Sequence, residues 1–202
     1  VQHREASEFK KDKLKVLAEL TKLRQICCDP RLHYEDYKAG SAKLDTCMEL
    51  VHGALDGGHR ILLFSQFTGM LDIIGKRLAK EDIAFLKLTG ASSKESRAKM
   101  VAQFQAGEVP VFLISLKAGG VGLNLTAADV VIHYDPWWNV AAQDQATDRA
   151  HRIGQQHTVT VYKLIAKDTI EERIMQMQES KRDLVNSVLG GDGISSALFT
   201  RE

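Results

Sequence analysis

The residues best suited to chemistry are Gln145, Arg149 and Arg152, which lie in the stretch QATDRAHRIGQQ at positions 145–156. Spacings of four and three residues predict that these side chains leave one face of a single helix. A guanidinium is permanently charged and presents a planar fork of donors that matches phosphate oxygens. The pattern therefore favours a polyphosphate ligand, although an isolated pair of arginines at this spacing is usually a solvated helix face.

Short apolar runs alternate with helical patterns along the chain, and this alternation predicts the elements that position the arginines. We expect an α/β fold in which right-handed crossovers build a mainly parallel sheet with helices on both faces. A capping-box pattern at 92–95 opens one of these helices. The expected strands are 61–64, 84–88, 111–115, 130–134 and 158–165, and the expected helices are 5–28, 42–55, 68–80, one reaching about 105, the arginine-bearing helix and 168–189.

The loops that follow the strands are the expected ligand sites, because open parallel sheets bind ligands beyond the carboxyl ends of their strands. Each loop supplies small or hydroxylated residues and backbone N–H groups near a helix start, which suits a phosphodiester backbone. Each loop taken alone is also compatible with an ordinary turn. The loops are 64–67, 89–92, 115–124 and 134–139.

The sequence contains no complete nucleotide cradle. The dipeptide at 75–76 lacks the earlier glycine of a phosphate loop, and Arg77 stands where Ser or Thr is required. Asp135 is followed by Pro136 and Trp137, so no pair of acidic metal ligands follows that strand. The chain thus offers arginines suited to phosphate without metal ligands, which is the pattern of half an active site.

Two aromatic and two imidazole side chains leave alternatives open. Trp137 and Trp138 either pack against the sheet edge or present an apolar edge to a nucleic acid. His133 and His151 have no Ser, Cys or metal-ligand companion at a readable spacing, which favours structural roles.

Composition limits the class of protein. The 202 residues, 44% hydrophobic, suit one globular domain with or without a helical appendage, and a net charge of +1 requires any nucleic-acid contact to be local. No apolar run is long enough for a membrane span, so no membrane contact is expected. The three cysteines form no CxxC pair, which favours a reduced intracellular protein without a metal site. The absence of an initiator Met suggests a piece of a longer protein.

Several segments together resemble the C-terminal RecA-like lobe of SWI/SNF-type ATPases in helicase superfamily two. The stretch LTKLRQICCDPRL at 20–32 resembles the segment that joins the two lobes of that family. The resemblance covers about residues 22–181. Its other segments are HRILLFSQFTGMLDII, FLKLTGASSKESRAKMVAQFQ, VFLISLKAGGVGLNLTAADVVIHYDPWWN and QATDRAHRIGQ.

This resemblance implies an ATP-driven translocase on double-stranded DNA, with ATP and Mg²⁺ bound between two lobes and the metal ligands on a first lobe. Arg149 and Arg152 would be arginine fingers for the γ-phosphate, with Gln145 beside them. The element that couples the nucleotide to DNA would comprise Gly120, Gly122 and Asn124. The residues implied to contact DNA are Ser65, Gln66, Thr89, Ser115, Lys117, Trp138 and Asn139.

The expected organisation is a helical linker at 1–41, a RecA-like lobe at 42–182 whose final helix braces it, and a C-terminal extension at 183–202. The expected partners are double-stranded DNA and the first lobe, and the lobe alone should be inactive. The alternative is a non-catalytic RecA-like module that binds nucleic acid or protein. We expect a cytoplasmic, nucleoid-associated protein if it is bacterial and a nuclear one if it is eukaryotic. Remodelling, repair and transcription all remain possible tasks.

Overall fold

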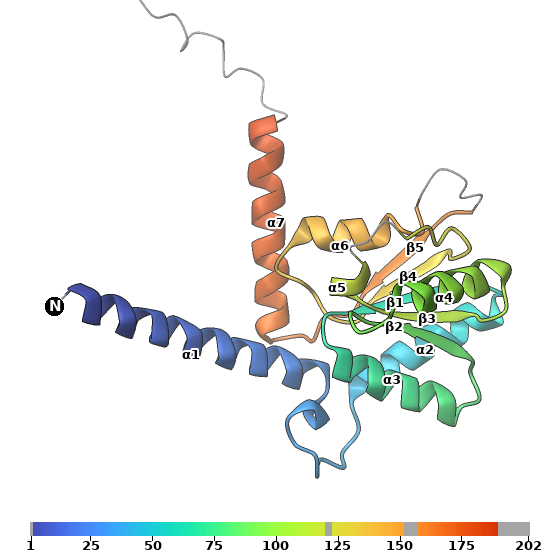
Figure 1. The fold of residues 1–202 in the computed structure, drawn as a ribbon, viewed down its shortest axis with the longest axis horizontal. Helices are drawn as coiled ribbons and strands as arrows, with labels where there is room; N and C mark the ends of the chain where they lie inside the picture. The colour runs from blue at the N-terminus through green and yellow to red at the C-terminus, as the bar shows by residue number, and fades with distance from the viewer. Residues whose placement is uncertain (1, 120–122, 152–156, 190–202) are drawn as a thin grey trace, which may run out of the picture.

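A computed structural model describes residues 2–119, 123–151 and 157–189 of the chain. Helices and strands alternate through most of this length (Figure 1). The elements are α1 (Gln2–Cys28), the 3-10 turn η1 (Pro30–Leu32), α2 (Ala42–Asp56), β1 (Ile61–Ser65), α3 (Thr68–Lys80), β2 (Phe85–Leu88), α4 (Lys94–Ala106), β3 (Val111–Ser115), α5 (Leu116–Gly119), β4 (Val130–His133), α6 (Val140–Thr147), β5 (Thr160–Lys163) and α7 (Ile170–Leu189).

The described strands form one five-stranded sheet in the order β2-β3-β1-β4-β5, and every neighbouring pair is parallel. This arrangement confirms the predicted α/β class. Strands β1, β3 and β4 are buried along their whole length. A strand buried on both faces needs a continuous apolar sequence, which is why these strands were readable as short apolar runs.

Helices cover the two faces of the sheet separately (Figure 1). One face packs against α2 and α3, with Leu63 and Leu113 among its buried residues. The opposite face packs against α4, α5 and α6, with Phe64 and Phe112 among its buried residues. Because successive residues of a strand point to opposite faces, each central strand contributes side chains to both cores.

Helix α1 projects away from the sheet and meets the rest of the protein only near its C-terminal end (Figure 1). The side chains of Leu14 and Leu17 are 66% and 59% exposed, whereas Cys28 at its end is buried. Helix α7 contacts α1. None of the described helices combines the length and apolarity that a membrane crossing requires.

The helix boundaries that differ from the sequence-based expectation include the start of α4 and the end of α6. The cap of α4 is Ser93, whose hydroxyl accepts a hydrogen bond from the Ser96 N–H, while Ser92 instead accepts from the Thr89 N–H within the turn after β2. Helix α6 ends at Thr147, so the helix predicted to carry Arg149 stops before that residue. At α4, the hydrogen bond that Ser92 accepts within the turn leaves Ser93 as the cap.

Two glycines give opposite expectations for a substitution by alanine. Gly107 ends α4 with φ of +84°, and a Cβ there would meet the Arg60 guanidinium. We expect Gly107→Ala to lower the free energy of unfolding by about 1–2 kcal/mol, because an L-residue is strained in this region. Gly53 lies within α2 with open space around its Cβ position, so Gly53→Ala should raise that free energy by about 1 kcal/mol. Urea unfolding of both variants checks this, and a stabilised Gly107→Ala would contradict it.

Candidate functional site

The strand register brings the predicted ligand loops to one edge of the sheet. Ser65 at the end of β1 is level with Ser115 at the end of β3, and Phe64 is level with His133 at the end of β4. The loops that follow β1, β3 and β4 therefore start side by side.

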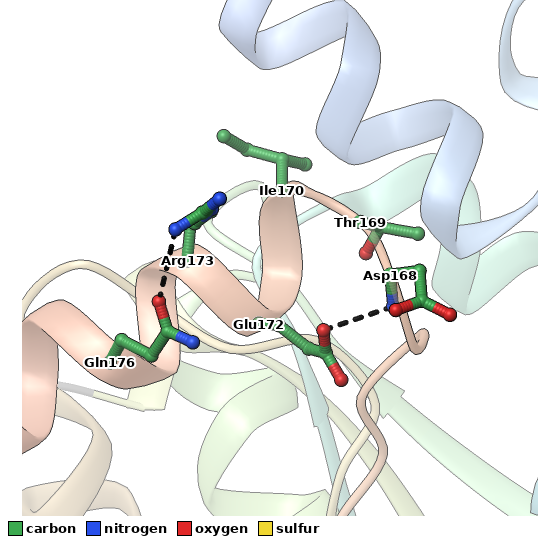
Figure 2. A pocket seen from close by; sticks show the side chains of 6 residues that line it. All are labelled: Asp168, Thr169, Ile170, Glu172, Arg173 and Gln176. Atoms are coloured by element: carbon green, nitrogen blue, oxygen red, sulfur yellow. Dashed lines mark hydrogen bonds between the residues drawn. The ribbon is translucent and has the colours of Figure 1, made fainter.

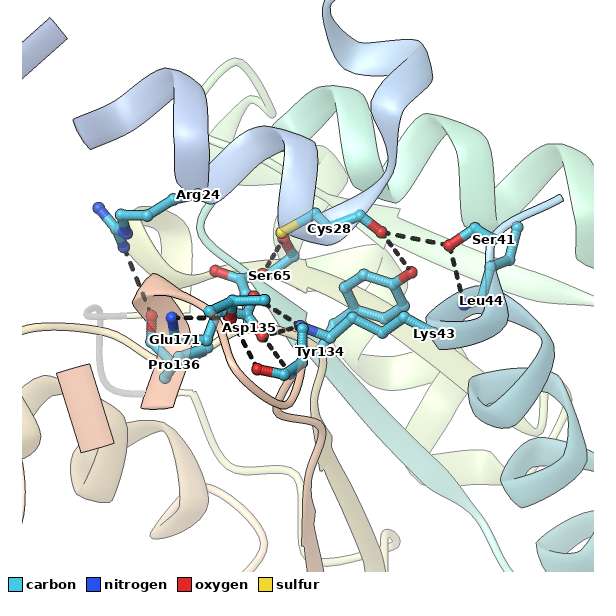
Figure 3. Close-up of polar contacts among 12 residues, drawn as sticks. Arg24, Cys28, Ser41, Lys43, Leu44, Ser65, Tyr134, Asp135, Pro136 and Glu171 are labelled. Carbon is cyan, nitrogen blue, oxygen red and sulfur yellow. Dashed lines mark hydrogen bonds and ion pairs between the residues drawn. The ribbon is translucent and has the colours of Figure 1, made fainter. Parts of the chain in front are cut away.

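A buried carboxylate joins the first and last of these loops. Asp135, after β4, is only 2% exposed. Its Oδ1 accepts a hydrogen bond of 2.5 Å from the Ser65 hydroxyl (Figure 3). Its Oδ2 accepts a hydrogen bond of 2.6 Å from the Gln66 side-chain amide. Burial raises the pKa of Asp135, and the hydrogen bonds from Ser65 and Gln66 oppose that rise. These contacts fix the loop after β4 against the loop after β1.

Helix α1 reaches this same loop through Arg24. The guanidinium carbon of Arg24 lies 5.6 Å from the ring centre of Phe67 and 5.4 Å from that of Trp138. Its Nη2 donates a 3.4 Å hydrogen bond to the carbonyl of Pro136 (Figure 3). Burial lowers the pKa of Arg24, and the negative charge of Asp135 is the main opposing influence.

A buried ion pair joins α2 to the start of α7. Lys43 Nζ lies 2.5 Å from a carboxylate oxygen of Glu171, and both side chains are almost fully buried (Figure 3). The ammonium also lies 5.2 Å from the centre of the Tyr134 ring. Burial raises the pKa of Glu171, and Lys43 opposes that rise. The Tyr134 hydroxyl donates a 3.0 Å hydrogen bond to the carbonyl of Cys28, so α1 is attached here as well.

Three of the residues predicted to contact DNA face the interior. Ser65 is buried against Asp135, and Gln66 is half-buried with its amide bonded to Asp135 and to the Pro136 carbonyl. Ser115 is buried, and its hydroxyl accepts from the Ala118 N–H at the start of α5. In this structure these side chains form hydrogen bonds within and between the loops, and those of Ser65 and Ser115 do not reach the surface.

The other predicted DNA contacts are wholly or partly accessible. Lys117 and Asn139 are exposed, and the Asn139 side chain also caps α6 by accepting from the Ala142 N–H. Thr89 and Trp138 are half-buried. Trp137 packs against the core beside α6, which resolves its alternatives in favour of packing, while Trp138 lies under the Arg24 guanidinium.

The structure does not bring Gln145 and Arg149 onto one helix face, so that prediction is wrong. Gln145 is exposed on α6, whereas Arg149 follows the helix end and is 2% exposed. The carbonyl of Arg149 accepts a 3.0 Å hydrogen bond from the Leu125 N–H, next to the exposed Asn124. The arginine stretch thereby adjoins the glycine-rich loop. Arg152, Gly120 and Gly122 lie outside the described residues.

No role was predicted from the sequence for four residues whose charged side chains are buried at this edge, namely Arg24, Lys43, Asp135 and Glu171. A charged residue at an otherwise apolar position of a helix was the available signal for Arg24, which sits among the leucines of α1. The contacts that these four residues make could not be predicted from the sequence, because the residues come from segments far apart in the chain.

The described ranges hold no candidate metal site. No group of three or more His, Cys, Asp or Glu side chains there could hold a metal ion. A pocket at the start of α7 contains none of the predicted site residues (Figure 2). Its lining is Asp168, Thr169, Ile170, Glu172, Arg173 and Gln176.

The parallel sheet and its clustered edge loops define a RecA-like lobe. Residues 42–154 match the family model described as the helicase conserved C-terminal domain. The chain belongs to this family, and it is the C-terminal RecA-like lobe of a SWI2/SNF2-type ATPase. The family includes ATP-dependent helicases and chromatin-remodelling ATPases.

Known proteins similar to this chain support the assignment. An uncharacterized ATP-dependent helicase of Mycoplasma pneumoniae is 44% identical over 183 residues, which are 90% of this chain and 18% of the helicase. The chain thus spans less than a fifth of that relative. The Sulfolobus solfataricus SWI2/SNF2 ATPase C-terminal domain is 36% identical with a TM-score of 0.72, covering 88% of this chain and 74% of that one. The Sulfolobus SWI2/SNF2 ATPase core in complex with dsDNA is 39% identical with a TM-score of 0.75, covering 90% and 39%.

His133, beside this site, gives a pH-dependent expectation. Burial lowers its pKa from 6.5 to about 3, and its ring lies against Phe64 and Thr147. As the pH falls below 6.5, the unfolded chain binds a proton that the folded chain does not accept until about pH 3. The free energy of unfolding should therefore be fully retained above pH 6.5 and fall by up to about 1.4 kcal/mol per pH unit below it.

The variant His133→Gln should be less stable at pH 7 but should show a shallower loss of stability between pH 6 and about pH 4. Urea unfolding across this range measures how steeply the free energy of unfolding falls with pH in each protein. All other titrating groups are common to the two proteins, so the difference between the two slopes reports His133. Equal slopes would contradict a neutral, buried His133.

Proposed function

We propose that this chain is the second motor lobe of an ATP-dependent translocase on double-stranded DNA. The proposal rests on one observation about the carboxyl edge of the sheet. The loops after β1, β3 and β4 start side by side there, and the arginine stretch adjoins residues 123–125 of the loop after β3. The Sulfolobus structure with dsDNA supports DNA as the polymer, and the relatives named as ATP-dependent helicases support ATP as the fuel.

ATP would bind between this lobe and a first lobe. The described residues offer no acidic cluster, so ligands for Mg²⁺ would come from that first lobe. Arg149 and Arg152 would approach the γ-phosphate, with Gln145 beside them, while Gly120, Gly122 and Asn124 would link the nucleotide to the DNA. Because Arg149 is buried here, closure of the two lobes would have to uncover it, and Arg152 is the more direct test.

DNA would lie across the loops at the carboxyl edge. We propose that Lys117, Asn139, Thr89 and Trp138 contact its backbone directly. Ser65, Gln66 and Ser115 would act one layer deeper by fixing the loops that present backbone N–H groups. Phosphate contacts of this kind position a protein on DNA without reading its sequence, as a translocase requires.

The segments outside the lobe would connect it to the rest of the motor. Residues 1–41 would join it to the first lobe, residues 42–182 would form the lobe, and residues 183–202 would extend it.

ATP would close the cleft and hydrolysis would reopen it, so alternating grips would move the protein along DNA. The lobe alone would not hydrolyse ATP.

Arg152→Ala in the full two-lobe protein tests this proposal. An arginine finger contributes about 10³ to 10⁵ in phosphoryl transfer, so kcat for ATP hydrolysis should fall at least about a thousandfold. Affinity for duplex DNA should stay within about twofold, because the DNA contacts lie in other loops. Steady-state ATPase assays and fluorescence anisotropy measure the two quantities.

Arg173→Ala is the matched control, since Arg173 is an exposed arginine on α7 and should not affect hydrolysis. Unchanged ATP turnover in Arg152→Ala would reject a catalytic role for this lobe, and it would favour the alternative in which the lobe is a non-catalytic binding module.

A further inference from the structure

A buried cation, Arg24, joins helix α1 to the loop that follows β4. Arg24 is 7% exposed, although residues 12–19 of the same helix are exposed. The charge lies near the end of a helix whose first part projects away from the lobe (Figure 1). Burial of a guanidinium is costly unless its charge and donors are compensated.

The partners of Arg24 come from two different edge loops. Phe67 belongs to the loop after β1 and immediately precedes α3, whereas Trp138 belongs to the loop after β4. The carbonyl of Pro136 accepts from Arg24 at 3.4 Å and from the Gln66 amide at 3.0 Å. One backbone oxygen is therefore shared between α1 and the loop after β1.

The segment that Arg24 contacts leads directly into α6. Asn139 caps that helix, and Arg149 follows its last turn. Asp135 anchors the beginning of the segment through Ser65 and Gln66. Between that anchor and the cap, Arg24 of α1 contacts Pro136 and Trp138, so a tilt of α1 would act on this segment through the guanidinium.

We propose that Arg24 is a positioning residue that couples the orientation of α1 to the loop at 135–139, and through it to α6 and the arginine stretch. This role deepens and rests on the proposed motor function, because α1 would carry the connection to the first lobe. A change in the angle between the lobes would reach the DNA-contacting loop through this guanidinium.

The test compares Arg24→Met and Arg24→Lys in the full-length protein, with linear duplex DNA as the probe. Methionine keeps the apolar stem but removes the cation and the donor, whereas lysine keeps both in a different shape. We expect Arg24→Met to keep ATP hydrolysis without DNA and to lose about tenfold in duplex-stimulated kcat, with an unchanged KM for ATP. Arg24→Lys should recover part of the stimulation. Arg173→Met is the matched control and should behave as wild type.

Hydrogen exchange of the same proteins provides a measurement that does not depend on activity. Amides of residues 137–145 should exchange about tenfold faster in Arg24→Met, while those of β1 and β3 stay unchanged. If Arg24→Met fails to fold, Arg24→Lys is compared with wild type in both assays, and a smaller change in the same direction is expected.

The outcomes separate the two proposals. A full-length wild-type protein that duplex DNA does not stimulate would overturn the motor function. Stimulated wild type together with equal stimulation in the Arg24 variants would overturn the coupling role, whether or not the amides exchange faster. A uniform rise in exchange across the lobe, with KM and kcat both altered, would also overturn it in favour of a general structural role.

Discussion

The structure depends on a buried carboxylate held between two loops. Asp135 would be costly to bury as an unpaired anion, so its hydrogen bonds with Ser65 and Gln66 constrain where the chain can go after β4. Because β1 and β4 are neighbours in the sheet, Ser65 and Asp135 lie within hydrogen-bond distance although they are 70 positions apart in the sequence. The ends of both strands are thereby fixed, and the segment that leads into α6 leaves the sheet from a defined point.

Other buried charges attach outlying helices to the same point. Arg24 brings in α1, and Lys43 with Glu171 joins α2 to α7. Each interaction is a charged pair or a cation near aromatic rings in a water-poor environment, where removal of one partner leaves the other uncompensated. Helices α1 and α7 are therefore held by buried charges near the edge at which ATP and DNA are proposed to act, which is the physical basis of the proposed coupling.

Sequence reasoning predicted the elements better than the site. The strands at 61–65 and 111–115 were readable because they are buried apolar runs, and α3 was predicted with its observed bounds. The end of α6 was missed because nothing local in the sequence distinguishes Asp148 as its cap. The buried partners of Asp135 were missed because they depend on strand order, which places β1 beside β4 and which periodicity does not encode.

The most direct test of the account is DNA-stimulated ATP hydrolysis by this chain alone and by the same chain joined to the preceding lobe. We predict no turnover by the chain alone and turnover stimulated by duplex DNA when the lobes are joined, because the proposed Mg²⁺ ligands and nucleotide cradle lie on the first lobe. Turnover by this chain alone, or a joined protein that duplex DNA does not stimulate, would contradict the assignment of this lobe as half of a DNA-dependent motor.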